Sequence, residues 1–200
     1  AIVRTLLEHG ADVNMRNKKG SGPLARAAMT NKLEVIDILL ASGAFLDNQD
    51  MNGTTAVHLA VALDFPDVML KLAEKGANLN LKDRNNFTPL HLCGKEKNAR
   101  CCEILLAHGA DSKVGGRNNS SPLHIAAAFN AEEVVGCFLS NSPESIDCLD
   151  SNQRSPLHVA CMVLRTSASD TSDVRGEEAA LTLIARGASV LLRDATMCLP

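Results

Sequence analysis

Four histidines recur at nearly equal intervals: His58, His91 and His124 are 33 residues apart, and His158 follows 34 residues later. Histidine is the commonest metal ligand in proteins, but a tetrahedral zinc ion needs every ligand atom about 2 Å away. If each histidine belongs to a separate pair of helices, stacked helices lie about 8–10 Å apart and the four rings cannot converge on one ion. We therefore expect no metal site and predict a structural role for these histidines.

A cysteine close to a histidine could support nucleophilic catalysis. Cys93 lies two residues after His91, and Cys161 lies three residues after His158. A nucleophile of this kind needs a histidine base and a third group that orients the base, and neither pair has an evident third member. The motifs G-x-x-x-x-G-K-[ST], G-x-G-x-x-G and H-E-x-x-H do not occur. We predict a chain that is not an enzyme and needs no cofactor.

The histidines belong to a longer repeat. Gly-Ala pairs share its 33-residue step, and a further pair resumes it after an insertion: Gly10-Ala11, Gly43-Ala44, Gly76-Ala77, Gly109-Ala110 and Gly187-Ala188. The motif around the histidines reads Thr88-Pro89-Leu90-His91, Ser121-Pro122-Leu123-His124 and Ser155-Pro156-Leu157-His158, with looser copies at Gly22-Pro23-Leu24-Ala25 and Thr55-Ala56-Val57-His58. This period and motif are typical of ankyrin repeats, and the chain resembles that family over essentially its whole length.

The repeat frame divides the chain into five complete repeats between two partial ones. The partial repeats are 1–16 and 194–200, and the complete repeats are 17–49, 50–82, 83–115, 116–149 and 150–193. Finished solenoids carry polar terminal repeats, so we expect this chain to be a piece of a longer array.

Local physical chemistry also predicts helices. Thr or Ser before Pro is an N-cap followed by a first helical position that needs no N–H. Gly43, Gly76 and Gly109 should end the second helices, because glycine adopts positive φ readily. The polar segments between, such as residues 77–86, resemble the family's protruding β-hairpin fingers. The expected fold is an all-α solenoid of stacked helix-turn-helix units with β-hairpin loops.

Three departures from the repeat are visible. Ser142-Pro143 replaces Gly-Ala, so the second helix of repeat 116–149 should end differently. Repeat 150–193 has a Ser/Thr/Asp-rich insertion near residues 164–175, which we predict to be an exposed loop. Gly94 interrupts a first helix at a cost of about 1 kcal/mol relative to Ala, so that repeat should be locally soft.

Composition narrows the class of partner. A net charge of −3 and five Phe as the only aromatic residues give no reason to expect nucleic acid. Neither a signal peptide nor about 18 uninterrupted apolar residues occurs, so we expect no membrane insertion. The seven cysteines form no C-x-x-C pair and mostly fall at small apolar positions. We interpret them as reduced core residues of a cytoplasmic or nuclear protein.

The resemblance implies a docking face for a protein partner, made of finger positions two, three and five and of the turn after each first helix. Carried onto this sequence, these positions are Met51, Asn52, Thr54, Leu63, Arg84, Asn85, Phe87, Lys95, Glu96, Arg117, Asn118, Ser120 and Phe129. Phe87 and Phe129 should face solvent and, with Arg84 and Arg117, anchor the partner, unless each only packs on a neighbouring finger.

The same face should be basic. Its cations are Lys18, Lys19, Arg84, Lys95, Arg117 and Arg154, against Glu96. This charge predicts an acidic, phosphorylated or extended peptide as the partner.

Two modifications are possible. Asn14 follows Asp12-Val13 in a pattern that resembles the target of ankyrin asparaginyl hydroxylases, although ordinary turn chemistry favours an unmodified Asn that bonds within its own hairpin. The insertion offers Thr166, Ser167, Ser169, Thr171 and Ser172 beside Asp170 and Asp173 as phosphate acceptors, or is a plain flexible insert.

The leading functional hypothesis is a non-catalytic protein–protein interaction module, either a scaffold or a regulatory binding region. The alternatives are a cytoplasmic ankyrin segment of an ion channel and the targeting arm of a multidomain enzyme. A membrane-spanning region or a catalytic motif elsewhere in a longer chain would decide between them.

Overall fold

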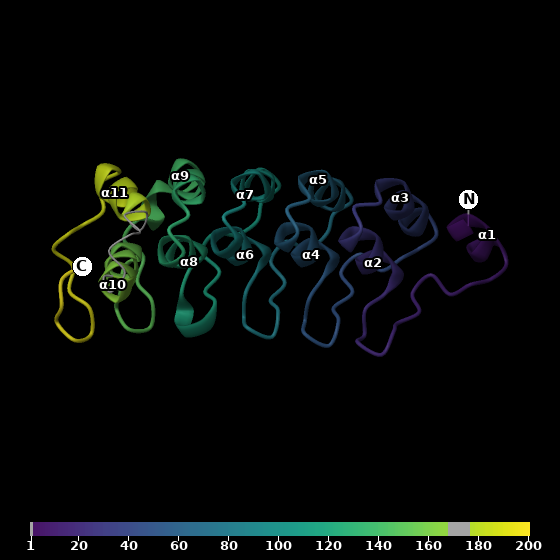
Figure 1. Cartoon of the computed structure of the whole chain (residues 1–200), viewed down its shortest axis with the longest axis horizontal. Helices are drawn as coiled ribbons and strands as arrows, with labels where there is room; N and C mark the ends of the chain where they lie inside the picture. The colour runs from purple at the N-terminus through teal and green to yellow at the C-terminus, as the bar shows by residue number, and fades with distance from the viewer. Residues whose placement is uncertain (1, 168–176) are drawn as a thin grey trace.

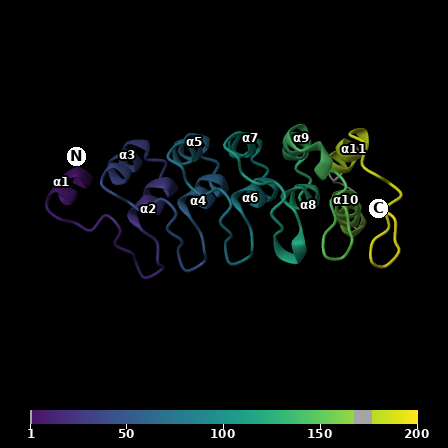
Figure 2. The same ribbon diagram turned by 180° about the vertical axis from the view of Figure 1, so that it is seen from behind.

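The computed structural model describes residues 2–167 and 177–200 of the chain. Helix pairs stack side by side in one row, and a loop, here called a finger, projects from the same side of each pair (Figure 1). The first helices form one layer: α2 (Pro23–Met29), α4 (Ala56–Ala62), α6 (Pro89–Glu96), α8 (Pro122–Ala128) and α10 (Pro156–Ser167). The second helices form the other layer: α1 (Ile2–Glu8), α3 (Leu33–Ala41), α5 (Pro66–Glu74), α7 (Ala99–Ala107), α9 (Glu132–Asn141) and α11 (Glu178–Ala185). The view from behind shows the same two layers, and the predicted all-α solenoid is confirmed (Figure 2).

Each first helix begins at the predicted motif. In repeat 50–82 the Thr55 side chain accepts a hydrogen bond from the His58 backbone N–H, and the His58 ring accepts one from the Thr55 backbone N–H. This reciprocal pair satisfies two of the N–H groups that a helix start leaves unpaired. Because the same pair recurs at Thr88 and Ser121, the motif fixes where successive first helices start.

The second helices end at glycines with positive φ, as predicted: φ is 86° at Gly43, 83° at Gly76 and 83° at Gly109. Helix α9 differs, since Ser142 after it has φ −138° and ψ 71°. A short 3-10 helix, η2 (Pro143–Ser145), follows at once. The different helix end predicted for repeat 116–149 is therefore confirmed.

The core is made of small side chains between the two layers. Ala28, Ala60 and Ala126 are fully buried. Gly94 is also buried inside α6, and a Cβ added there would lie 2.7 Å from the backbone nitrogen of Ala126 in α8. The missing side chain is what lets α6 and α8 pack closely, which gives Gly94 a packing role that the sequence did not suggest; the softness of its repeat stays a prediction.

The fingers contain no strand within the described residues, so the β-hairpins expected from the sequence are replaced by tight turns. Backbone hydrogen bonds close each turn, among them one from the Asp50 N–H to Thr54 O at 3.0 Å and one from the Asp83 N–H to Phe87 O at 2.9 Å. The Asp carboxylates accept further N–H groups of the same turn. A finger of this length closes a turn but has no room for a ladder of strand bonds.

The insertion is described only at its start. Helix α10 continues to Ser167, so residues 164–167 are helical and do not belong to a loop. The rest of the predicted loop, with Ser169, Thr171 and Ser172, lies outside the described residues.

Candidate protein-binding surface

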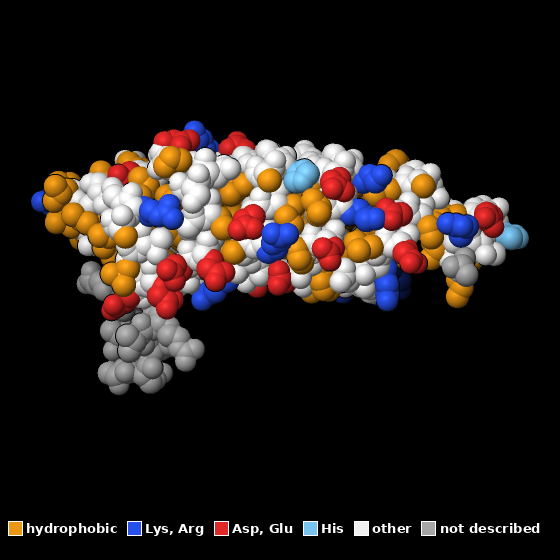
Figure 3. Space-filling model, turned by 90° about the horizontal axis from the view of Figure 1, so that it is seen from above, with side chains coloured by type: hydrophobic (Ala, Val, Ile, Leu, Met, Phe, Trp, Pro, Cys, Tyr) orange, Lys and Arg blue, Asp and Glu red, His pale blue; other side chains and the backbone are white. Residues whose placement is uncertain are grey.

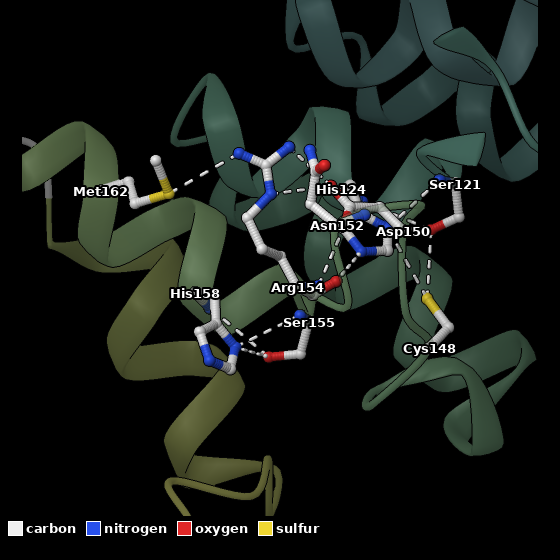
Figure 4. Close-up of polar contacts among 9 residues, drawn as sticks. All are labelled: Ser121, His124, Cys148, Asp150, Asn152, Arg154, Ser155, His158 and Met162. Atoms are coloured by element: carbon white, nitrogen blue, oxygen red, sulfur yellow. Dashed lines mark hydrogen bonds and ion pairs between the residues drawn. The ribbon is translucent and has the colours of Figure 1, made fainter. Parts of the chain in front are cut away.

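The repeated histidines tie each first helix to the next finger. His124 Nδ1 accepts the Ser121 N–H at 3.1 Å, so the neutral ring carries its proton on Nε2 and donates it to Arg154 O at 2.8 Å (Figure 4). Equivalent bonds run from His58 to Phe87 O at 3.1 Å, from His91 to Ser120 O at 3.0 Å and from His158 to Cys198 O at 3.2 Å. The structural role predicted for the four histidines is confirmed.

Burial favours the neutral form of three of these rings. It lowers the pKa of His91 to about 4 and also lowers the pKa of His58 and His124, although the bonded carbonyls oppose the shift. A protonated ring would have to release the backbone N–H that it accepts at Nδ1. The network therefore forms fully only with uncharged histidine.

The finger tips are also joined sideways. The Met51 N–H donates to Lys19 O at 2.9 Å, and the Arg84 N–H donates to Asn52 O at 2.8 Å. Further along, the Ser151 N–H donates to Asn118 O at 2.9 Å. Each of these bonds crosses from one finger to the next, but among the described residues no backbone bond joins the tips of the third and fourth fingers.

Most predicted docking residues lie on this edge. The exposed tip residues are Met51, Asn52, Arg84, Asn85, Arg117 and Asn118, and Thr54 and Ser120 are half-buried. In the fourth finger, Arg117 and Asn118 belong to a 3-10 turn, η1 (Arg117–Asn119). The tip of the second finger is bonded to both neighbouring fingers, whereas the third and fourth tips are each bonded to one neighbour within the described residues.

Phe87 is not the free aromatic that the sequence suggested. Its side chain is half-buried and its ring stacks on His91, with centroids 5.6 Å apart and planes 10° from parallel. Because the ring covers a residue of the histidine network, its removal would disturb the fold as well as any docking face.

A row of half-exposed apolar side chains marks the C-terminal ends of the first helices. Leu63 and Phe129, both predicted, are the C-cap residues of α4 and α8 and are each 43% exposed. Met29 in α2 (38%) and Met162 in α10 (47%) extend the row, here called the apolar row. Both methionines stand at the same repeat position as Lys95, which the prediction included, and they were missed because the predicted set was confined to repeats 50–149.

One cation counted from the sequence is not free. Arg154 is half-buried and pairs with the buried carboxylate of Asp150 at 2.6 Å, and its guanidinium also contacts Met162 Sδ (Figure 4). Lys95 pairs at 2.6 Å with Glu96, the anion that the sequence count had set against the cations. The remaining predicted cations are Lys18, Lys19, Arg84 and Arg117, all exposed.

Asn14 holds two repeats together. Its amide Nδ2 donates to Gly43 O at 3.0 Å, and its Oδ1 accepts the Phe45 N–H at 2.7 Å. Asn80, two repeats later, makes a contact equivalent to the second one, because its Oδ1 accepts the Asp111 N–H at 2.9 Å. These bonds account for an asparagine at these positions, and hydroxylation of Asn14 stays a prediction.

Neither His–Cys pair noted in the sequence has a ring nitrogen to spare, since His91 and His158 each accept a backbone N–H at Nδ1 and donate to a carbonyl. All seven cysteines are free thiols. In the part of the chain that the structure describes, no three His, Cys, Asp or Glu side chains are grouped to hold a metal ion. Among the same residues, no helix has the length and hydrophobicity to cross a bilayer.

Sequence reasoning missed one polar cluster. The Ser121 hydroxyl lies 2.8 Å from His124 Nδ1 and 3.2 Å from the thiol of Cys148, which comes from the next finger (Figure 4). The repeat alignment gave only a weak signal, because the equivalent residues are Asn48, Leu81 and Val114, so the position already varies between polar and aliphatic.

The second helices form the opposite face of the molecule. Figure 3 shows acidic, basic and hydrophobic side chains mixed over this face, without a field of one sign. The finger tips and the apolar row together therefore form the surface where fingers are hydrogen-bonded to neighbouring fingers and where half-exposed apolar side chains recur at the same helix end.

The family was tested by comparison with known proteins. The family model described as ankyrin repeats (3 copies) matches residues 1–83, 46–115 and 90–194. A search of curated proteins returned no match. With nearly the whole length matched and the helix pairs, histidine network and glycine ends in place, the chain belongs to the ankyrin-repeat family.

Proposed function

We propose that the chain is a non-catalytic scaffold or regulatory binding region whose protein partner docks on the finger tips and the apolar row, centred on residues 50–149. Ankyrin repeats are protein–protein interaction modules. The observation that carries the proposal is the apolar row, which places Leu63 and Phe129 at equivalent helix ends beside finger tips that are each bonded to at least one neighbouring tip. Apolar anchors on a rigid support supply most of the energy of a protein interface.

The partner's docking segment is extended and acidic. The row follows the long axis of the solenoid over several repeats, which suits a segment without its own compact fold. Lys18, Lys19, Arg84 and Arg117 offer positive charge along the tips. Asp50 and Asp83 stand beside them, but their carboxylates already accept backbone N–H groups of the fingers. The seven free thiols fit a reducing compartment, the cytoplasm or the nucleus.

The test uses peptides selected from a displayed random library as the binding probe. Leu63→Ala and Phe129→Ala should each weaken the selected peptides about tenfold, the effect of losing an interface anchor. The matched control is Leu70→Ala, in α5 of the same repeat as Leu63, because Leu70 has a similar exposure of 37% but lies on the second helices. Loss of binding in Leu70→Ala with normal binding in the other two would show that the docking face is misassigned.

The charge of the partner is tested separately. Arg84→Glu combined with Arg117→Glu should weaken acidic peptides and flatten the salt dependence of their affinity. Arg186→Glu, at the end of α11, makes the same type of charge change away from the fingers. If the Arg84→Glu, Arg117→Glu double variant and Arg186→Glu bind the acidic peptides with the same affinity, the proposal that the partner is acidic is wrong. The proposed docking face is not affected by that result.

A further inference from the structure

The junction between the fourth finger (residues 112–121) and the fifth (residues 145–155) has small residues where other junctions have aliphatic ones. Ser112 stands at a position that the other fingers fill with an aliphatic side chain: Val13, Leu46, Leu79, Ile146 and Val190. Cys148 stands where the third and sixth fingers have Leu81 and Leu192. Both exchanges remove volume from the same junction.

A side chain that bridges neighbouring junctions is missing as well. Gln49 Nε2 donates to Lys82 O at 2.9 Å and so joins the second and third fingers. Lys82 Nζ donates to Gly115 O at 2.7 Å and joins the third and fourth. The next residue in this series is Gly115, which has no side chain to reach the fifth finger.

These exchanges leave a cavity of about 260 Å³, here called the junction pocket. Its lining includes Ser112, Leu149 and the cluster of Ser121, His124 and Cys148, and Figure 4 draws the cluster. The Ser112 hydroxyl lies 3.2 Å from that of Ser142, so the polar replacement contacts the unusual helix end of the next repeat, 116–149. The pocket shares no lining residue with the predicted docking set.

The charges of the junction pocket cancel. Its two ionic side chains, Lys113 and Glu144, stand 3.1 Å apart and pair with each other. The amide of Asn119 can donate and accept hydrogen bonds, and the Ser121 hydroxyl and Cys148 thiol, which contact each other, add polar atoms to the lining. An uncharged group that donates and accepts fits this lining, and among uncharged protein side chains a primary carboxamide combines two N–H donors with an acceptor oxygen, more than the single O–H of Ser or Thr.

We propose that the junction pocket binds the carboxamide of an Asn or Gln side chain carried by the protein partner. Its volume lies just below the roughly 300–1,000 Å³ of cofactor and drug-sized sites, which favours a single side chain. The inference rests on the proposed function for the source of the carboxamide, but the chemistry of the pocket can be tested without any partner.

Propionamide serves as the probe, and propionate is its charged control of the same size. Occupancy is measured as slower alkylation of Cys148 by iodoacetamide, in which the sulfur displaces iodide and the thiol proton passes to the buffer. The reaction is run at mildly alkaline pH, because burial raises the pKa of the Cys148 thiol. Peptide mass spectrometry compares Cys148 with the exposed Cys198 in the same sample.

A ligand of this size binds in the range of roughly 1–100 mM, so about 100 mM propionamide should slow alkylation of Cys148 at least twofold. Propionate should not slow it, and Cys198 should be unaffected by both. Equal protection by the two compounds, or no protection, would overturn the proposal. If Leu63→Ala still weakens the binding of the selected peptides in that case, the proposed function is unaffected.

Ser112→Leu restores the aliphatic side chain and should remove the protection, whereas Ser112→Ala keeps the space and should retain it. Thermal unfolding of both variants shows whether they fold. Selected peptides that contain Gln or Asn should bind Ser112→Leu more weakly than Ser112→Ala. Equal binding of such peptides by the two variants would overturn the assignment of the carboxamide to the partner.

Discussion

Gly94 in α6 lies directly against Ala126 in α8, at the centre of the solenoid. A Cβ on Gly94 would stand 2.7 Å from the Ala126 nitrogen and 3.0 Å from the Ala126 Cα. Real Cβ atoms essentially never approach another heavy atom as closely as 2.7 Å. Both neighbouring atoms belong to backbone, which cannot rotate out of the way. The contact fixes the spacing of the two helices that carry Lys95 and Phe129.

Gly94→Ala should therefore destabilise the protein by about 2–3 kcal/mol, the cost of overpacking a well-filled core. Helix propensity alone predicts the opposite sign, a gain of about 1 kcal/mol. Urea unfolding measures the difference. Gly136→Ala in α9 is the matched control, because a Cβ there would meet nothing within 4 Å, and it should be neutral or stabilising. A stabilised Gly94→Ala protein would show that α6 and α8 are not in this contact.

Stability should fall as the pH is lowered from about 6.5 to 4. Burial lowers the pKa of His91 from 6.5 to about 4, so between these values the unfolded chain binds more protons than the folded one. The stabilisation is complete above pH 6.5 and is lost as pH falls through the folded pKa; His91 alone accounts for at most about 3 kcal/mol. His58 and His124 shift in the same direction.

Urea unfolding at several pH values above about 5 checks this, because most carboxylates titrate lower. His91→Gln should be less stable at neutral pH than the wild-type chain and should also show a weaker dependence on pH. A free energy of unfolding that stays constant or increases on acidification in this window contradicts the neutral histidine network.

Asp150 should be the most sensitive residue of the fifth finger. Burial by itself would raise the pKa of Asp150, but hydrogen bonds from the Arg154 side chain and from the N–H groups of Arg154 and Asn152 outweigh it and lower the pKa. Asp150→Ala leaves the half-buried Arg154 without its partner and should cost about 3 kcal/mol. Asp150→Asn should cost less, since Asn17 closes the first finger through the same N–H contacts. Equal losses in the two variants would show that the turn bonds do not contribute.

Asn48→Leu should stabilise the protein. Asn48 Oδ1 is buried and has no hydrogen-bond partner within the described protein, and the equivalent position holds Leu81 in the next finger. Removing an unsatisfied polar group should yield about 1–2 kcal/mol, measurable by thermal unfolding. Asn80→Leu is the contrasting variant and should destabilise, because Asn80 Oδ1 accepts the Asp111 N–H. A loss of stability in Asn48→Leu would show that the amide is better satisfied than the geometry indicates.

The sequence by itself determined the order of the helices and most of their ends. Thr55 with His58 starts a helix through bonds made within four residues, and Gly43 ends one through its own backbone freedom, so both features are local and can be predicted from neighbours in the chain. The exposure of Leu63 and Phe129 also follows from the period, because every repeat presents the same helix end to solvent.

Only the tertiary structure decided what depends on contacts between repeats. Helix propensity predicts Gly94 as a weak point, but the residue that requires a glycine there is Ala126 in α8, about one repeat away in sequence. Phe87 covers His91, and Arg154 is neutralised by a buried Asp150, so neither the aromatic anchor nor the count of basic charges could be read from residue types. The junction pocket likewise arises because Ser112 and Cys148, 36 positions apart, come to face one space. Local interactions set the repeat, whereas packing between neighbouring repeats sets which side chains remain available to a partner.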